Sequence, residues 1–159
     1  MRQYKNSRFG YTLAEVLIVI SIIGIITAIS VPKFASAKNQ AQLTGAMTRV
    51  SRGIMAARQA AIQRGKVAYF KHSNNKFWVI VDTTGNLTDS IVITPPYNIS
   101  TEYGVAITAP VGVTSIQYDP RGVATQPTKR VFSFKHSVSN TVDSLCVSRL
   151  GNTVRQVCP

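Results

Sequence analysis

The sequence predicts an α+β protein in which one long N-terminal helix packs on an antiparallel C-terminal β-sheet domain. An uncharged apolar run occupies residues 16–31. Apolar residues then recur at helical spacing as far as residue 64, and short β-prone runs separated by turn residues follow from residue 66. At 159 residues the chain has the length of one domain, and its second half is long enough to bury a core.

The first ten residues, MRQYKNSRFG, are polar and basic and contain no acid. A basic segment before an apolar run keeps that end of the chain in the cytoplasm. An ordinary secretory signal would end in a small-residue cleavage site, whereas this run continues into Val31-Pro32-Lys33-Phe34. Counted as residues 11–34, the apolar stretch reaches the roughly 20 residues that a membrane-spanning helix needs. We therefore expect this stretch to be a transmembrane segment.

A single apolar stripe marks the next part of the helix, residues 35–65. Its members recur at spacings of three and four: Leu43, Met47, Val50, Ile54, Ala57 and Ala61. Gly65 follows Arg64 and suits a helix C-cap. The stripe predicts an amphipathic helix docked on a sheet, and we interpret the intervening arginines as its solvated face: Arg49, Arg52, Arg58 and Arg64.

The remainder, residues 66–159, is predicted to form a β-rich globular head. Pro95-Pro96 is expected to end the third strand, Pro120-Arg121-Gly122 separates the fourth strand from the fifth, and residues 97–112 have the least defined pattern. The predicted strands are Val67–Phe70, Phe77–Val81, Ile91–Thr94, Ile116–Asp119, Arg130–Phe134, Ser144–Ser148 and Thr153–Cys158.

The charge balance is strongly basic, with 18 Lys and Arg against 6 Asp and Glu. Loss of residues 1–10 would leave 15 basic and 6 acidic side chains, a formal +9. Such an excess favours a polyanionic partner, and a solvated basic surface explains it equally well. Composition leaves both interpretations open.

The pattern of reactive side chains does not indicate catalysis. His72 and His136 have no accompanying nucleophile, the acids show no paired spacing, and no Gly-rich phosphate loop is present. The two cysteines have no metal-ligand spacing. We expect neither enzyme activity, nor a cofactor, nor a metal.

The segment Phe9–Ile20, FGYTLAEVLIVI, closely resembles the class III signal of type IV prepilins and type II secretion pseudopilins. The resemblance implies that a membrane peptidase cuts after Gly10 and N-methylates Tyr11. It makes Glu15 the acid at the fifth mature position, and it places Pro32 where pilins commonly carry a helix-kinking proline. It also implies a single-pass inner-membrane protein that later enters a periplasmic or cell-surface filament.

The physical role of Glu15 follows from this resemblance. A buried carboxylate is unfavourable unless it is paired. Inside a filament, Glu15 of one subunit can meet the Tyr11 amine of its neighbour, which would neutralise the charge and set the register between subunits. The implied partners are other pilin or pseudopilin subunits, the prepilin peptidase and the inner membrane.

A second resemblance covers three later segments: Ala57–Gly65, Tyr118–Gly122 and Cys146–Arg155 are similar to signatures of the GspH/FimT group of pilin-like proteins. In some members a Gly-Arg-x-Arg turn binds DNA during uptake for transformation. Here Asn152 follows Gly151, and Arg155 lies one residue later than the usual second arginine. The charge near this turn can form a patch for double-stranded DNA or a rim for subunit docking, and the residues concerned are Arg121, Lys129, Arg130, Arg149 and Arg155.

The cysteines, Cys146 and Cys158, both lie near the C-terminus. Export would place them in an oxidising compartment, where pairing is expected. A disulfide closing this short loop would add roughly 2–4 kcal/mol. Two free thiols are expected only if the domain remains in the cytoplasm.

Three kinds of function fit the sequence. The first is a minor pilin of a type IV pilus, with DNA uptake as an added role. The second is a type II secretion pseudopilin that serves protein export, and the third is a single-span periplasmic protein outside any filament. Gly10 and Glu15 argue against the third, while the basic surface and the cysteine pair favour the pilus.

Overall fold

The structure is a computed structural model of the chain, and it describes residues 10–85, 87–109, 113–125, 130–148 and 151–155. These residues form two compact units with their boundary between Ala37 and Lys38. The units are treated separately below as the N-terminal unit and the head. Helix α1 (Leu13–Arg64) contributes to both units.

Helix α1 is one uninterrupted helix of 52 residues, which confirms the predicted long N-terminal helix. It ends where the sequence predicts, because Gly65 adopts a left-handed φ of +59°. The Lys66 N–H then donates to the Ala61 carbonyl at 3.3 Å, which satisfies one of the orphan carbonyls of the last turn.

In the head, the apolar stripe of α1 forms the centre of the core. All six predicted stripe residues are buried, together with Ala46, Gly53 and Ala60. Small residues let the helix approach the sheet closely. A Cβ on Gly53 would lie 2.6 Å from the ring of Phe77, so the helix backbone and this ring are in direct contact.

The first sheet, sheet A, has the strand order β3-β2-β1-β5 and is antiparallel throughout. Its strands are β1 (Ala68–Ser73), β2 (Lys76–Asp82), β3 (Ser90–Asn98) and β5 (Ser115–Tyr118). Ala68 and Phe70 point into the core with Phe77 and Val79. The alternate residues therefore form the outer face of the sheet.

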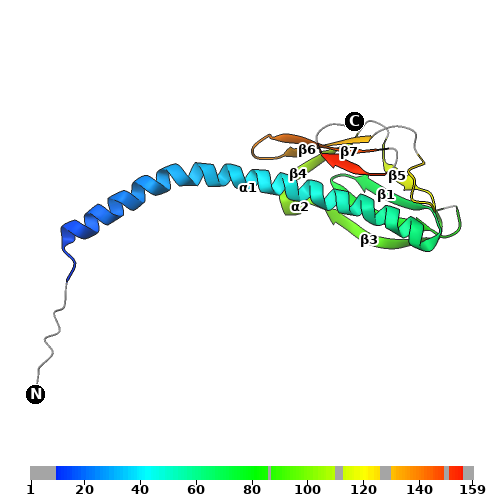
Figure 1. The fold of residues 1–159 in the computed structure, drawn as a ribbon, viewed down its shortest axis with the longest axis horizontal. Coiled ribbons are helices and arrows are strands. Elements are labelled where there is room, and N and C mark those ends of the chain that lie inside the picture. The colour runs from blue at the N-terminus through cyan, green and yellow to red at the C-terminus, as the bar shows by residue number, and fades with distance from the viewer. Residues whose placement is uncertain (1–9, 86, 110–112, 126–129, 149–150, 156–159) are drawn as a thin grey trace, which may run out of the picture. The chain divides into compact units, whose positions relative to one another are not determined.

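The second sheet, sheet B, has the order β4-β6-β7-β8 and is also antiparallel. Its strands are β4 (Val105–Thr108), β6 (Arg130–His136), β7 (Val142–Val147) and β8 (Thr153–Arg155). Phe132 and Phe134 of β6 are fully buried in the common core. Figure 1 shows the head portion of α1 running alongside the strands of both sheets.

Asn75 links the two sheets. Asn74 and Asn75 both have positive φ and form the two-residue turn between β1 and β2, where the sequence predicts a turn. The Asn75 side chain accepts a hydrogen bond from the Ile107 N–H of sheet B at 2.9 Å, and its carbonyl accepts one from Ile99 at 3.0 Å. The turn therefore also fastens sheet A to sheet B.

The structure corrects the strand prediction at two places. Pro95-Pro96 does not end the third strand, since β3 continues to Asn98. Proline is tolerated because β3 is an edge strand whose register with β2 shifts between Phe77 and Val79. After β3, the short helix α2 (Ile99–Tyr103) was not predicted; Asn98 caps its start by accepting from Ser100 N.

A third correction concerns the basic residues. Arg121 lies in the Pro120-Arg121-Gly122 turn between the fourth and fifth predicted strands, and Arg130 begins the fifth, an order that predicts one hairpin. In the structure, β5 pairs with β1 in sheet A, whereas β6 pairs with β4 and β7 in sheet B. The two arginines therefore flank a connection between sheets and do not share a hairpin.

Candidate functional site

The helix in the N-terminal unit begins at a capping-box sequence that the sequence prediction missed. The Thr12 hydroxyl accepts a hydrogen bond from the Glu15 N–H at 3.2 Å, and its carbonyl accepts bonds from Glu15 and Val16. The signal was present as Thr12-x-x-Glu15, a threonine followed three residues later by an acid. Glu15 thus lies in the first helical turn, where the helix dipole favours negative charge.

Glu15 also lines a shallow hollow on this unit. Tyr11, Glu15, Val16 and Val19 surround a volume of about 290 Å³. Glu15 and Val19 lie four residues apart on one helix face, and Tyr11 comes just before the helix begins at Leu13. The arrangement presents a carboxylate beside apolar side chains on the surface of this unit.

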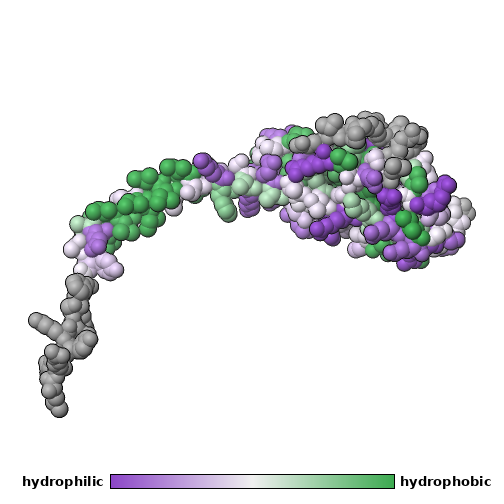
Figure 2. Space-filling model, in the orientation of Figure 1, coloured by the Kyte–Doolittle hydropathy of each residue, from purple (hydrophilic) through white to green (hydrophobic). Residues whose placement is uncertain are grey.

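The side chains that follow Glu15 are apolar and exposed. Figure 2 shows a nearly continuous hydrophobic surface along this part of α1. By length and composition, α1 is able to cross a membrane, and its most apolar window is 0% buried. Ser21 and Thr27 donate back to the carbonyls of Leu17 and Ile23, so their hydroxyls are satisfied within the helix.

Pro32 lies inside the helix. It has no N–H to donate to the carbonyl of Ala28, so one rung of the helical ladder is missing there. This is the local weakness that produces a kink in other helices. The predicted kink itself stays a prediction, as does cleavage after Gly10.

Two turns of the head lie in the segments Tyr118–Gly122 and Cys146–Arg155, and both turns pack against other parts of the fold. Gly122 has a φ of +77°, and a Cβ there would lie 2.6 Å from Ile62 of α1. Gly151 has a φ of +76°, and a Cβ there would lie 2.5 Å from the Tyr118 ring. Because these glycines have no Cβ, the two turns can adopt a left-handed backbone and can also lie in close contact with Ile62 and Tyr118.

The second turn is also fastened to α1 by polar contacts. Arg58 donates from Nη1 to the Asn152 side-chain oxygen at 3.0 Å, and Ser51 and Thr153 share a hydrogen bond of 2.6 Å. The predicted solvated face is therefore wrong for Arg58. It is also wrong for Arg49, which is half-buried with its guanidinium 4.4 Å from the centroid of the Tyr97 ring. Arg52 and Arg64 are exposed, as predicted.

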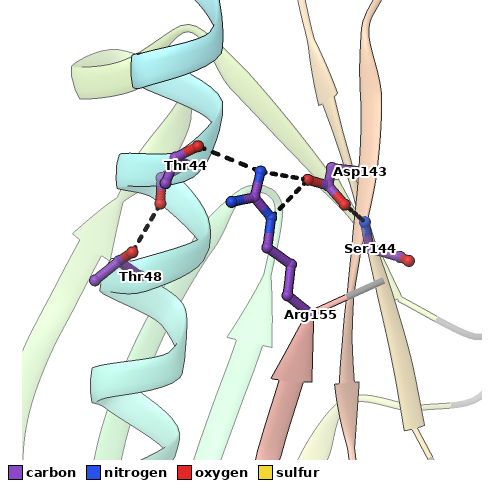
Figure 3. A network of polar contacts seen from close by, with 5 residues as sticks. All are labelled: Thr44, Thr48, Asp143, Ser144 and Arg155. Atoms are coloured by element: carbon purple, nitrogen blue, oxygen red, sulfur yellow. Dashed lines mark hydrogen bonds and ion pairs between the residues drawn. The ribbon is translucent and has the colours of Figure 1, made fainter. Parts of the chain in front are cut away.

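Arg155 makes an ion pair that the sequence did not reveal. Its guanidinium contacts the Asp143 carboxylate at 2.8 Å through Nη2 and at 3.0 Å through Nε. The same Nη2 reaches the Thr44 hydroxyl of α1 at 3.4 Å (Figure 3). Arg155 therefore joins β8, β7 and the helix, and its charge is largely matched by Asp143.

The other candidate DNA-binding residues come from separate segments of the chain. Arg121 is 85% exposed at its side chain and pairs with Asp119 at 2.9 Å. Arg130 is half-buried, and its Nε is buried without a hydrogen bond to any described residue. Lys129 and Arg149 lie outside the described residues. The three described candidates therefore come from the turn after β5, from β6 and from β8.

The structure describes only one of the two cysteines of the predicted disulfide. Cys146 is 2% exposed in β7 and lies opposite Val154 of β8. Cys158 lies outside the described residues. The pairing therefore stays a prediction.

Among the described residues, no three of His, Cys, Asp and Glu are grouped so that they could hold a metal ion. His136 is buried and hydrogen-bonded on both ring nitrogens, to Gln42 and to the β6–β7 turn. These bonds give it a structural role in joining α1 to sheet B.

Comparisons with known proteins agree with this geometry. The chain matches the family model of the type II transport protein GspH over residues 35–151 and that of the prokaryotic N-terminal methylation motif over residues 5–31. Two fimbrial proteins of Pseudomonas aeruginosa are each 40% identical over 57 residues, 36% of this chain and 36% of their own length. The chain thus matches about a third of the length of these curated relatives.

The fold is shared with solved structures. The type IV minor pilin FimU of Pseudomonas aeruginosa PAO1, in one crystal form, aligns with a TM-score of 0.60 at 13% identity, over 74% of this chain and 90% of FimU. A second crystal form gives a TM-score of 0.56 over 72% and 93%. This likeness confirms the pilin fold, and the GspH match covers well over half of the chain. The protein therefore belongs to the GspH family of pilin-like and pseudopilin-like proteins.

Proposed function

We propose that this protein is a minor pilin of a type IV pilus, cut after Gly10, N-methylated at Tyr11 and anchored in the inner membrane by residues 11–34 until it enters the filament. The observation that carries the proposal is the Thr12–Glu15 start of an exposed apolar helix. It lies within the match to the N-terminal methylation motif. Membership of a pilin-like family supports assembly with other pilin or pseudopilin subunits.

The apolar segment has two successive environments in this proposal. In the bilayer it is surrounded by lipid, and in the filament it is surrounded by the same segments of other subunits. Both environments are apolar, so Glu15 is unfavourable in either one until it meets a positive partner. Cleavage after Gly10 creates such a partner, the α-amino group of Tyr11 on a neighbouring subunit.

An alternative is a pseudopilin of a type II secretion system, which the description of the matched GspH family favours. The pilus is preferred because of the identity to fimbrial proteins, and the FimU-like fold is compatible with it. Deletion of the gene in the source organism separates the two. If the protein is a minor pilin, the deletion strain should have fewer surface pili and normal protein export. If the strain has normal pili but keeps inside the cell the enzymes that it normally secretes, the secretion system would be favoured.

The assembly role of Glu15 is tested in the deletion strain, complemented with wild type, Glu15→Ala or the control Ser21→Ala. Ser21 is an exposed polar residue of the same helix whose hydroxyl bonds only to its own helix. We expect Glu15→Ala to be processed normally and to be depleted several-fold from sheared filaments, with Ser21→Ala unaffected. Equal incorporation of all three would remove the pairing role.

Binding of double-stranded DNA at the C-terminal end stays a prediction. The Asp119 and Asp143 partners of Arg121 and Arg155 reduce the charge that these arginines can offer to phosphate. Binding of duplex by the full chain should therefore be weak and fall steeply with salt. A gel shift at low salt that Arg149→Ala and Arg155→Ala both diminish would support it, and no shift would remove it.

A further inference from the structure

The outer face of sheet A carries a hollow of about 360 Å³, here called the sheet A hollow. Tyr69 and Lys71 lie on this face because they alternate with the buried Ala68 and Phe70 on β1. Trp78 of β2 lies directly opposite Lys71 in the strand register. Two aromatic rings and one ammonium group thus meet on one surface, and Leu87, 42% exposed, adds an apolar edge.

Several polar groups around the hollow have no partner within the described part of the chain. These are the Tyr69 hydroxyl, the Trp78 indole N–H and the hydroxyls of Ser73 and Thr114. The Lys71 ammonium makes only a distant cation–π contact, 5.9 Å from the centroid of the Tyr69 ring. Burial, and then the charge of Asp82, raise the pKa of Tyr69, so its hydroxyl stays protonated and can donate.

A second hollow provides the comparison. The groove between α1 and β8 has a similar volume, about 330 Å³, but several of its polar groups make hydrogen bonds within the fold. Thr44 accepts from Arg155, and Ser51 pairs with Thr153. Those four groups of the groove are used by the fold, whereas the four groups named above for the sheet A hollow have no partner among the described residues.

The chemistry of the sheet A hollow selects the kind of ligand. Flat aromatic side chains pack against the C–H face of a sugar ring, while hydroxyl and indole groups bond to ring hydroxyls. The volume lies near the lower end of ligand sites, roughly 300–1,000 Å³, which suits one ring. Lys71 can add a charge-assisted hydrogen bond to a carboxylate. We propose that the sheet A hollow binds one carboxylate-bearing sugar residue, a uronic acid, of an acidic glycan.

Single-stranded nucleic acid is the other ligand that uses aromatic faces and a cation. Its backbone places a charge at every nucleotide, so binding depends on several cationic contacts. Lys71 is the one Lys or Arg that lines the described part of the hollow, and burial lowers the pKa of His72, which keeps that ring neutral. One cation matches one carboxylate better than a phosphate chain.

Trp78 is the sole tryptophan of the chain, so its fluorescence reports on the hollow directly. The full chain in detergent is titrated with a hyaluronan tetrasaccharide, in which glucuronate alternates with a neutral sugar, and with neutral cellotetraose. We expect a saturable change with the acidic ligand and an affinity for it about tenfold above that of the neutral one, the effect of one charge-assisted hydrogen bond.

Lys71→Ala should lower the affinity for the acidic tetrasaccharide to that for the neutral one. Lys71→Gln, which keeps the side-chain stem over Tyr69, should do the same and guards against misfolding of the alanine variant. The matched control is Lys135→Ala, an exposed lysine on sheet B, which should change nothing. No saturable change with the tetrasaccharide would overturn the proposal. Equal loss in the Lys71 and Lys135 variants, or tighter binding of oligothymidylate with a steep salt dependence, would also overturn it.

Discussion

Arg58 of helix α1 donates a hydrogen bond of 3.0 Å to the side-chain oxygen of Asn152, in the turn before β8. The two residues lie 94 positions apart in the chain. Together with the Ser51–Thr153 contact, this bond holds the second sheet against the helix. The last of the segments that resemble the GspH/FimT signatures, Cys146–Arg155, thus has a structural role.

The Arg58–Asn152 bond should contribute measurably to stability. Arg58→Ala and Asn152→Ala are each expected to lower the free energy of unfolding by about 1 kcal/mol. The double variant should lose less than the sum, because both changes remove the same bond. Urea unfolding of the full chain, followed by Trp78 fluorescence, measures this. The exposed Arg52→Ala is the control, and strictly additive losses would show that the bond contributes nothing.

Gly151 and Gly85 form a matched pair for the close contact with Tyr118. Both have left-handed φ, +76° and +86°, but a Cβ on Gly85 meets nothing within 4 Å. Gly85→Ala should therefore lower the free energy of unfolding by about 1 kcal/mol, which is the effect of the left-handed backbone alone. Gly151→Ala should lower the free energy of unfolding by roughly 1–3 kcal/mol more, because its Cβ would also overpack against Tyr118. Equal losses in urea unfolding would contradict the contact.

The Asp119 turn predicts a dependence on pH. The Val123 N–H, and then Arg121, lower the pKa of the Asp119 carboxyl below its ordinary value of 3.8. The ionised group thus stabilises the fold in full above that value, and the contribution is lost as pH falls through the lowered folded pKa. Asp119→Asn should be less stable than wild type at neutral pH, and the difference should vanish in acid. A difference that is constant down to about pH 2 would contradict this.

The predicted disulfide is tested by peptide mapping without reduction. We expect one cross-linked peptide containing Cys146 and Cys158 in protein isolated from the periplasmic side. Cys158→Ser should lower the free energy of unfolding by about 2–4 kcal/mol. Free thiols on both residues in exported protein would refute the pairing.

The long helix and its buried stripe could be predicted because both are local patterns. The spacing of Leu43, Met47 and Val50 alone predicts the buried face of the helix, and Gly65 predicts where the helix ends. The N-terminal methylation motif could be predicted because its residues have a fixed register along the chain, and the family match over residues 5–31 confirms the motif.

What could not be predicted depends on contacts between distant segments. Nothing near Pro95 in the sequence shows that its strand lies at a sheet edge, where proline is allowed. Arg58 looks like a solvated charge, and Arg155 like a free charge for phosphate or subunit docking, until the fold brings Asn152 and Asp143 beside them. Thr12 is different, because its capping-box pattern with Glu15 was readable and was overlooked.

Mass spectrometry of the N-terminal peptide of protein isolated from membranes or filaments tests the central claim most directly. The account predicts a chain that begins at Tyr11 and carries one added methyl group on its α-amine. Replacement of Gly10 by valine should leave the leader attached. A wild-type chain that retains residues 1–10, or that begins at another residue, would contradict the account.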